Sequence, residues 1–276
     1  MGQKERKRKA AFPHAAVVGF PSQNSGPLAA VPPGFLTPGL PSAFSALSLS
    51  NLPEIFFPSM TGYPNLGLHT GYTRIGHYSS CHSILLVGEG DFSFSLSLAK
   101  AFGHASHMVA TSLDTPETLN DKYRFAMENV RELRALGCRV GHGIDVKTMT
   151  SNVLLCLCYL KFDRIVFNFP HAGFEYPEED VRQIKMHRRL LKGFFLNAKE
   201  MLLEDGEIHV THKTSSPFKE WNLQQKAERR GLVLVERAPF NICDYPGYFN
   251  KRGYGVVSDT SFPIGRCCTF KFKLKK

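Results

Sequence analysis

Short apolar runs alternate with longer amphipathic stretches from about residue 77 to the end of the chain. The apolar runs predict strands at 84–87, 107–113, 138–143, 162–167, 207–212, 232–237 and 266–274. Most of them are separated by helical patterns, at 92–102, 116–136, 149–160, 177–201 and 217–230. Such alternation favours an α/β fold, so we expect a seven-stranded, mostly parallel sheet with helices on both faces.

The first 76 residues follow a different pattern. They are rich in Pro, Gly, Ser and Ala and contain no Lys or Arg between Lys9 and Arg74. A segment of this composition buries too little apolar surface to fold, so we expect a disordered extension over 1–76 and a globular domain over 77–276. The tip, Lys4–Lys9, has five bases in six residues. This favours nuclear import or a nucleic-acid contact, and a solvated tail is the alternative.

Charge and cysteine content narrow the function classes. Lys and Arg total 34 against 24 Asp and Glu, a net charge of +10, which favours a polyanionic partner such as nucleic acid. A basic protein without such a partner is the alternative. The seven cysteines have no Cys-x-x-Cys spacing, so we expect reduced core thiols of an intracellular protein and no metal site. No apolar stretch reaches the ~18 residues of a transmembrane helix.

The first predicted strand, 84–87, runs directly into two glycines and the start of a helix. A strand, a tight glycine turn and a helix with free N–H groups are typical of nucleotide binding. Two carboxylates in this turn would repel a pyrophosphate, but they suit a ligand with an amino group and ribose hydroxyls. S-adenosylmethionine fits better than NAD, and an ordinary tight turn without a ligand is the alternative. The predicted cofactor residues here are Gly88, Glu89, Gly90, Asp91, Phe92 and Ser93.

Two further carboxylates stand where strands end, and ligands of such sheets bind outside the carboxyl ends of the strands. Asp114 follows the second predicted strand and can accept hydrogen bonds from both ribose hydroxyls of an adenosine cofactor. Asp145 follows the third and can receive the adenine amino group. The alternatives are a role of Asp114 in capping the next helix and a role of Asp145 in closing a turn.

An irregular segment, Asn168-Phe169-Pro170-His171, directly follows the fourth predicted strand. It resembles the Asn-Pro-Pro-aromatic motif of methyltransferases that act on planar nitrogen, with Phe169 in place of the first proline and His171 in place of the aromatic residue. Asn168 would hold the acceptor ring, Phe169 would stack on it and His171 would be the base. A proline turn with a buried Asn is the alternative. His209 and His212, on the fifth strand, could add a second imidazole, although packed histidines are commoner.

A loop between the last two strands, 244–254, interleaves aromatic and basic residues. This composition suits stacking on unpaired nucleotides and contact with phosphates, so we expect a lid over the site. A packed connection is the alternative. The predicted RNA-binding residues are Lys213, Tyr245, Tyr248, Lys251 and Arg252.

Five segments, in order, closely resemble the 25S ribosomal RNA uridine-N3-methyltransferase-like family: 87–94, 110–114, 162–171, 206–214 and 244–248. The resemblance covers about 77–276. It implies a Rossmann-like methyltransferase fold, S-adenosylmethionine as donor and an RNA uridine as acceptor. Gly88, Gly90 and Asp114 match the family's cofactor positions, and Asn168 to His171 match its acceptor motif.

This resemblance leads to an expected function and leaves rivals open. We expect N3 methylation of a uridine in large-subunit ribosomal RNA, and the uridine must be single-stranded or flipped out because its Watson–Crick edge reacts. The expected location is the nucleus or nucleolus, with the cytoplasm as alternative. A noncatalytic RNA-binding relative and a nicotinamide-dependent oxidoreductase are the competing functions.

Overall fold

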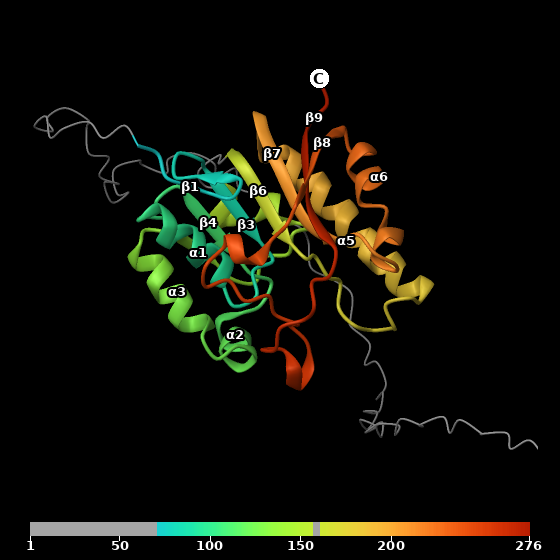
Figure 1. Ribbon diagram of the computed structural model, residues 1–276, viewed down its shortest axis with the longest axis horizontal. Coiled ribbons are helices and arrows are strands. Elements are labelled where there is room, and N and C mark those ends of the chain that lie inside the picture. Colours follow the sequence, from blue (N-terminus) through green and yellow to red (C-terminus); the bar gives the residue numbers. More distant parts are fainter. Residues whose placement is uncertain (1–70, 157–160) are drawn as a thin grey trace, which may run out of the picture. The chain divides into compact units, whose positions relative to one another are not determined.

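The computed structural model describes residues 71–156 and 161–276 (Figure 1). The predicted disordered extension up to residue 70 and its basic tip, Lys4–Lys9, lie outside the described residues. The described chain opens with a small antiparallel hairpin of β1 (Arg74–Ile75) and β2 (Tyr78–Ser79). No helix in the described ranges is long and apolar enough to cross a membrane.

A seven-stranded sheet forms the centre of the fold, as the alternating pattern predicts. Its strands are β3 (Ile84–Val87), β4 (Met108–Thr111), β5 (Arg139–Gly141), β6 (Phe162–Asn168), β7 (Leu202–Lys213), β8 (Leu232–Pro239) and β9 (Cys267–Leu274). The spatial order is β5-β4-β3-β6-β7-β9-β8. The first five strands in chain order pair in parallel, and β9 is antiparallel to both β7 and β8. The prediction of a mostly parallel, Rossmann-like methyltransferase sheet is therefore confirmed.

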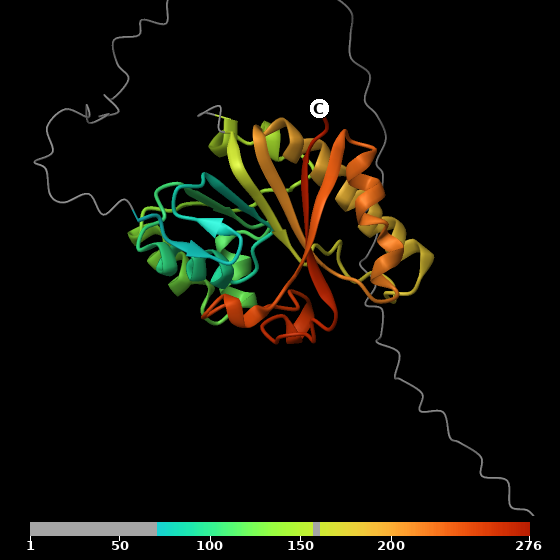
Figure 2. The same cartoon turned by 45° about the horizontal axis from the view of Figure 1, so that its top comes forward.

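Helices cover both faces of this sheet (Figures 1 and 2). Successive residues of a strand point to opposite faces, so Leu85 and Val87 join one core and Ile84 and Leu86 the other. The first core includes side chains from α5 (Val181–Glu200) and α6 (Leu223–Glu228), and α4 (Val153–Cys156) also contributes to it. The second core includes side chains from α1 (Ser93–Phe102), α2 (Pro116–Lys122) and α3 (Ala126–Ala135).

Two predicted helices differ from the observed ones in ways that shape the site. The pattern over 116–136 predicts one helix, but Tyr123 is extended, with φ −136° and ψ 118°, and separates α2 from α3. Its ring is buried and lines the site described below. The helix predicted from 177 begins at Val181, after Asp180, whose carboxylate accepts from the Arg182 N–H. Residues 172–180 are therefore a loop.

The parallel strands β3, β4, β6 and β7 bring their carboxyl ends to one edge of the sheet. The register also brings the loop between β8 and β9, residues 240–266, to this edge, because Lys213 at the end of β7 pairs with Cys267 at the start of β9. This loop, which we call the C-terminal loop, reaches α2, where the Ser258 hydroxyl donates to the Lys122 carbonyl. Figure 2 shows it in orange and red below the sheet.

Candidate active site

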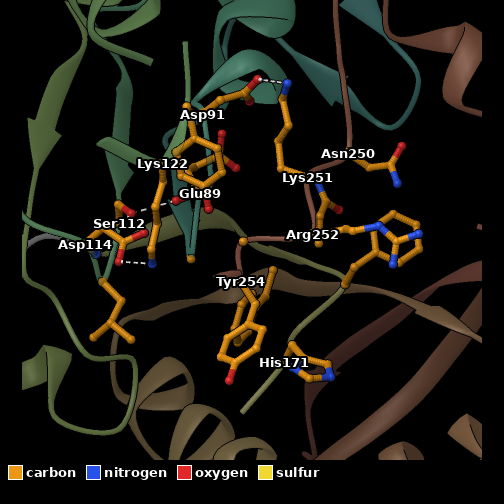
Figure 3. A pocket seen from close by; sticks show the side chains of 18 of the residues that line it. Glu89, Asp91, Ser112, Asp114, Lys122, His171, Asn250, Lys251, Arg252 and Tyr254 are labelled. Atoms are coloured by element: carbon orange, nitrogen blue, oxygen red, sulfur yellow. Dashed lines mark hydrogen bonds and ion pairs between the residues drawn. The ribbon is translucent and has the colours of Figure 1, made fainter. Parts of the chain in front are cut away.

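A cavity of about 360 Å³ opens at the carboxyl edge of the sheet (Figure 3). The turn from β3 to α1 forms one wall and the ends of β4 and β6 form another. The C-terminal loop closes the remaining side with residues 248–254. The size lies in the range of small-molecule and cofactor sites.

The turn after β3 takes its shape from residues next to one another in the sequence. Gly88 has φ +66°, and a Cβ there would collide with the Phe167 ring. Phe92 adopts a left-handed conformation, φ 61°, just before α1. The Asp91 carboxylate accepts from the Ser93 N–H at 3.0 Å. The turn thus holds Gly88 and Gly90 against the cavity, which both of them line.

Both carboxylates of this turn are buried and engaged with the protein. Glu89 accepts from the backbone N–H and the hydroxyl of Ser95, at 3.1 and 2.7 Å. Burial raises the pKa of Glu89 to about 7, and burial also raises the pKa of Asp91. Lys251 of the C-terminal loop lies 3.6 Å from Asp91. Both acids line the cavity, but their side chains also stabilise the first turn of α1.

Two residues of the predicted cofactor set do not line this cavity, and the structure corrects their assignment. Phe92 is fully buried, and its ring packs in the core beside α1. The Ser93 hydroxyl accepts from the Phe249 N–H at 3.0 Å and so joins the turn to the C-terminal loop. Both residues therefore stabilise the turn that lines the cavity without lining the cavity themselves.

The carboxylates after β4 and β5 line the cavity as expected from their places in the chain. Asp114 forms an ion pair with Lys122 at 2.7 Å. Asp145 accepts from the backbone N–H of Lys147 at 2.9 Å and pairs with its ammonium at 3.1 Å. Each carboxylate keeps a protein partner beside the cavity, and Figure 3 shows the Asp114 pair.

The segment after β6 brings an unusual set of groups to the opposite wall. Neither amide atom of Asn168 finds a hydrogen-bond partner in the described part of the chain, although both atoms are buried. Unpaired buried amide atoms are costly, and a ligand in the cavity would satisfy them. Phe169 has φ 46°, and its ring makes edge contacts with Phe240 and Phe262.

A second cavity, of about 230 Å³, adjoins the first. It is lined by Pro170, Glu178, His212, Lys213, Phe218 and Trp221 together with residues shared by the two cavities. The shared residues are Phe169, His171, Phe174, Lys251, Arg252 and Phe262. The two cavities therefore share a wall that contains His171.

The His171 ring is held on two sides. Its Nε2 lies 2.6 Å from Oε1 of Glu178, and its plane stacks on Phe174 at 3.9 Å. Its Nδ1 is buried and has no hydrogen-bond partner among the residues that the structure describes. Glu178 also lies 3.3 Å from Nε2 of the fully buried His187, a longer contact without good hydrogen-bond geometry.

Sequence reasoning missed both partners of His171. Glu178 falls in the stretch predicted as the start of a helix, where an acid commonly serves only the helix. His187 lies on the apolar face of α5, between Ile184 and Leu191, and a lone polar residue on such a face was the available signal. Its importance depends on contacts with the loop that precedes α5.

His171, Glu178 and His187 offer ligand atoms within 4.8 Å of one another, the geometry of a metal site. Proton positions argue against one. His187 Nδ1 accepts from the Ala172 backbone N–H at 3.2 Å, so a neutral ring carries its proton on Nε2. A metal-binding histidine normally donates its other N–H, whereas here that nitrogen is an acceptor. Within the cluster, a hydrogen bond joins His171 to Glu178, and His187 lies beside this pair.

The three cationic residues that were predicted to bind RNA all line the second cavity, but Lys251 also forms an ion pair within the protein. Arg252 is exposed and lines both cavities, and Lys213 lines the second beside the Phe218 and Phe262 rings. Lys251 lines both cavities too, but it is paired with Asp259 at 2.7 Å.

The two tyrosines that were assigned to RNA, Tyr245 and Tyr248, differ from the prediction. Tyr245 is 3% exposed and stacks on Phe240 in the core, so its assignment to RNA is wrong in this structure. Tyr248 is half-buried against Phe94 and lines the first cavity instead of the second. Aromatic residues between bases fit a packed loop as well as a nucleotide surface.

The histidines of β7 do not supply a second base. Burial lowers the pKa of His209 to about 4, and its Nε2 lies 2.9 Å from Glu207 in the core. Burial also lowers the pKa of His212 to about 4, and its Nε2 donates to the Phe218 carbonyl at 3.1 Å. Of these two histidines, only His212 lines the second cavity, and its Nε2 is already hydrogen-bonded to the Phe218 carbonyl.

Comparisons with known proteins place the chain among methyltransferases. Residues 85–252 match the family model described as BMT5-like, rRNA (uridine-N3-)-methyltransferase. An uncharacterized protein of Arabidopsis thaliana, At4g26485, is 50% identical over 72% of this chain and 95% of its own length. Heavy metal-associated isoprenylated plant protein 41 of the same plant is 49% identical over 73% of this chain, which spans only 39% of that longer protein.

A characterised enzyme and a solved structure lie further away. The 25S rRNA (uridine(2634)-N(3))-methyltransferase of Saccharomyces cerevisiae is 24% identical over 65% of this chain and 68% of its own length. The crystal structure of NSun6 from Pyrococcus horikoshii is 15% identical, covers 71% of this chain and 49% of its own, and has a TM-score of 0.48.

Proposed function

Since this chain belongs to the BMT5-like, rRNA (uridine-N3-)-methyltransferase family, we propose that it methylates N3 of a uridine in large-subunit ribosomal RNA. The methyl donor in this proposal is S-adenosylmethionine, and the acceptor is an unpaired or flipped-out uridine. Two adjoining cavities support the proposal, because a two-substrate transfer needs two sites that meet at the reacting atoms.

The first cavity has the groups that an adenosine cofactor needs. Gly88 and Gly90 offer close approach to backbone, Asp114 and Asp145 offer acceptors, and the unpaired amide of Asn168 offers both a donor and an acceptor. S-adenosylmethionine bound there would supply an electrophilic methyl group. The amide of Asn168 is the strongest sign of fit, because a buried amide without partners fits a ligand-binding site better than a packed wall.

The second cavity suits a planar base. Aromatic rings of Phe169, Phe174 and Trp221 line it, and cationic side chains of Lys213 and Arg252 stand beside them. An imide such as uracil presents a proton on N3 between two carbonyl oxygens. His171 Nδ1 is an acceptor for that proton, and the cations are donors to the oxygens. The wall therefore complements uridine better than cytidine, which has no N3 proton.

His171 is the proposed base. Uridine N3 holds its proton at neutral pH, so its removal during attack accelerates the transfer by about 10² to 10⁴. The single observation that carries this assignment is the place of His171 on the wall that the two cavities share, with an Nδ1 that has no hydrogen-bond partner among the described residues. Asn168 and Phe169 have supporting roles in holding the ring.

A transfer assay tests the proposal. The purified chain is incubated with isotope-labelled S-adenosylmethionine and unmodified large-subunit ribosomal RNA, and the RNA is digested to nucleosides for mass spectrometry. We expect labelled N3-methyluridine, and loss of it in His171→Ala. Binding of RNA without any methylated nucleoside would favour the noncatalytic relative, and binding of NAD would favour the oxidoreductase.

The cellular part of the proposal depends on the basic tip and on the substrate. We propose nuclear and nucleolar residence, because large-subunit ribosomal RNA is made there and Lys4–Lys9 has the composition of an import signal. A fluorescent fusion without residues 1–9 should lose nuclear enrichment. An unchanged distribution would reduce the segment to a solvated tail.

A further inference from the structure

We propose that Glu178 is a positioning residue that fixes the ring orientation and tautomer of His171, so that Nδ1 is the nitrogen that receives the acceptor proton. This inference rests on the proposed function. It adds to that function a residue outside the Asn168–His171 segment and a reason for the direction of proton transfer.

The first step is the tautomer of His171. An ionised carboxylate only accepts hydrogen bonds, and Glu178 Oε1 lies 2.6 Å from Nε2, so Nε2 carries the proton. Partial burial alone would raise the pKa of Glu178, but the hydrogen bond with His171 and the nearby His187 ring outweigh burial and hold the pKa at about 2. Glu178 is therefore ionised at neutral pH. The remaining ring nitrogen, Nδ1, keeps its lone pair.

The second step is the rigidity of the carboxylate. Glu178 lies in the loop before α5, and two side chains of α5 hold this loop. His187 accepts from the Ala172 N–H, and its ring stacks on Trp221 at 3.8 Å. Gln183, also fully buried, accepts from the Tyr176 N–H at 3.1 Å and donates to the Gly173 carbonyl. The part of the loop from Ala172 to Tyr176, just before Glu178, is thus fixed by neutral, hydrogen-bonded groups.

The third step is the charge balance during transfer. The N3–H bond of uridine breaks and a proton joins Nδ1 of His171, which becomes an imidazolium cation beside the Glu178 anion. The N3 electron pair forms the new bond to the methyl carbon, and the sulfur of the donor keeps the pair of the broken C–S bond. Solvent then takes the proton from His171. The cationic groups lining the same cavity are Lys213, Lys251 and Arg252, so Glu178 is its compensating anion.

Glu178→Gln tests the proposal because it keeps the shape and removes the charge. Glu179→Gln is the matched control, since Glu179 is the exposed neighbour in the same loop. We expect methyl transfer to uridine to fall roughly 10²-fold or more in Glu178→Gln, as for other carboxylates that orient a histidine base. Affinity for S-adenosylhomocysteine should stay near that of the control. The charge of Glu178 contributes to stability, so both variants are assayed at a temperature at which each remains folded.

A substrate with a more acidic N3 separates positioning from general damage. Fluorine at C5 withdraws electrons and makes the N3 proton of 5-fluorouridine easier to remove. RNA with this base should recover at least about tenfold of the Glu178→Gln loss, because a weaker base then suffices. An equal loss on both RNAs would overturn the proposal.

A measurement without any RNA separates this inference from the proposed function. Nitrogen-15 NMR of the labelled protein distinguishes protonated from unprotonated ring nitrogens of His171. We expect Nε2 protonated and Nδ1 free in the wild type and in Glu179→Gln, and a mixture of tautomers in Glu178→Gln. The same spectrum in all three proteins would refute the role of Glu178, whereas absence of methyl transfer in the wild type would refute the proposed function alone.

Discussion

The two cavities of the active site are built in different ways. The donor side of the first cavity comes from one part of the chain, Gly88 to Asp145, in which the turn after β3 is closed by near neighbours, and the rest of its wall comes from the end of β6, the loop that follows it and the C-terminal loop. The second cavity is assembled from residues between 169 and 262, which come from the loop after β6, the end of β7, the turn before α6 and the C-terminal loop. Local hydrogen bonds shape the first cavity, and packing between distant segments shapes the second.

This difference predicts that substitutions in the two cavities affect different steps. A change on the acceptor side should slow methyl transfer without lowering the affinity for the cofactor. A change on the donor side should lower that affinity before it slows the transfer. Five substitutions test the comparison of the two cavities, and the predictions run from the largest expected effect to the smallest.

The largest effect is expected from His171→Ala. Methyl transfer should fall by roughly 10²-fold or more, and affinity for S-adenosylhomocysteine should stay within about twofold. The residual rate should climb with pH, because an ionised uridine no longer needs a base. Single-turnover rates across a pH series, with calorimetry for the cofactor product, give both quantities. A normal rate and pH profile would make His171 a packing residue.

Asp114→Ala should mainly affect the donor side. Loss of a hydrogen bond to a charged group costs about 1.5 to 3 kcal/mol, so affinity for S-adenosylmethionine should fall about 10- to 150-fold. Calorimetry measures it, and the transfer rate at saturating cofactor should change much less. Wild-type affinity would remove Asp114 from the site, and an equal fall in the saturated rate would contradict the separation of the two cavities.

The two cavities should also respond to pH in opposite directions. Glu89 has its pKa raised to about 7 by burial, so the folded protein holds a proton that the unfolded chain releases near pH 4.5. Stability therefore falls as pH rises from about 4.5 to 7. Glu178 has its pKa lowered to about 2, so its contribution is present above about pH 4.5 and is lost as pH falls toward 2.

Two substitutions isolate these contributions. Relative to wild type, Glu89→Gln should gain stability as pH rises from about 4.5 to 7, by at most about 1.4 kcal/mol per pH unit. Glu178→Gln should lose its difference from wild type progressively as pH falls from about 4.5 to 2. Urea unfolding at a series of pH values measures both slopes, and parallel curves for Glu89→Gln and wild type would contradict the raised pKa.

The contrast between local hydrogen bonds in the first cavity and packing between distant segments in the second explains which site residues can be predicted from the sequence. The glycine turn and the carboxylates after β4 and β5 were predicted, because each depends on residues that follow a strand directly. Glu178 and His187 were missed, since their roles depend on a loop that reads as the start of a helix. The break at Tyr123 was missed for a similar reason: its ring approaches Gly90 and Gly253, and the helical pattern of 116–136 contains no sign of this contact.

The burial of Tyr245 has the same origin. Its neighbours in sequence alternate between aromatic and basic side chains, and this composition does not distinguish a surface loop from one that packs. Contacts with Phe94 of α1 and with Phe240 at the start of the loop decide the matter. The seven strands were predicted in type and order along the chain because their apolar runs are local. Acceptor-side residues could be predicted only where they follow the strand itself.

The smallest effect is expected from Lys122→Met, which acts on the donor side. Lys122 pairs with Asp114 at 2.7 Å, and both side chains are partly exposed, so the pair contributes at most about 1 kcal/mol. An adenosine ligand that uses Asp114 must share this carboxylate with Lys122. Removing the ammonium should therefore tighten S-adenosylhomocysteine binding by up to about fivefold, and transfer at saturating cofactor should not change.

Lys100→Met is the control for Lys122→Met, since Lys100 forms a similar pair with Glu132, 3.0 Å apart, and neither residue lines the cavity. Calorimetry on both variants isolates the local effect from the loss of one positive charge. Unchanged affinity in Lys122→Met would mean that the ligand does not compete for Asp114. Weaker binding would make Lys122 itself a contact of the cofactor, and the donor cavity would then depend on α2 as well as on the turns that follow its strands.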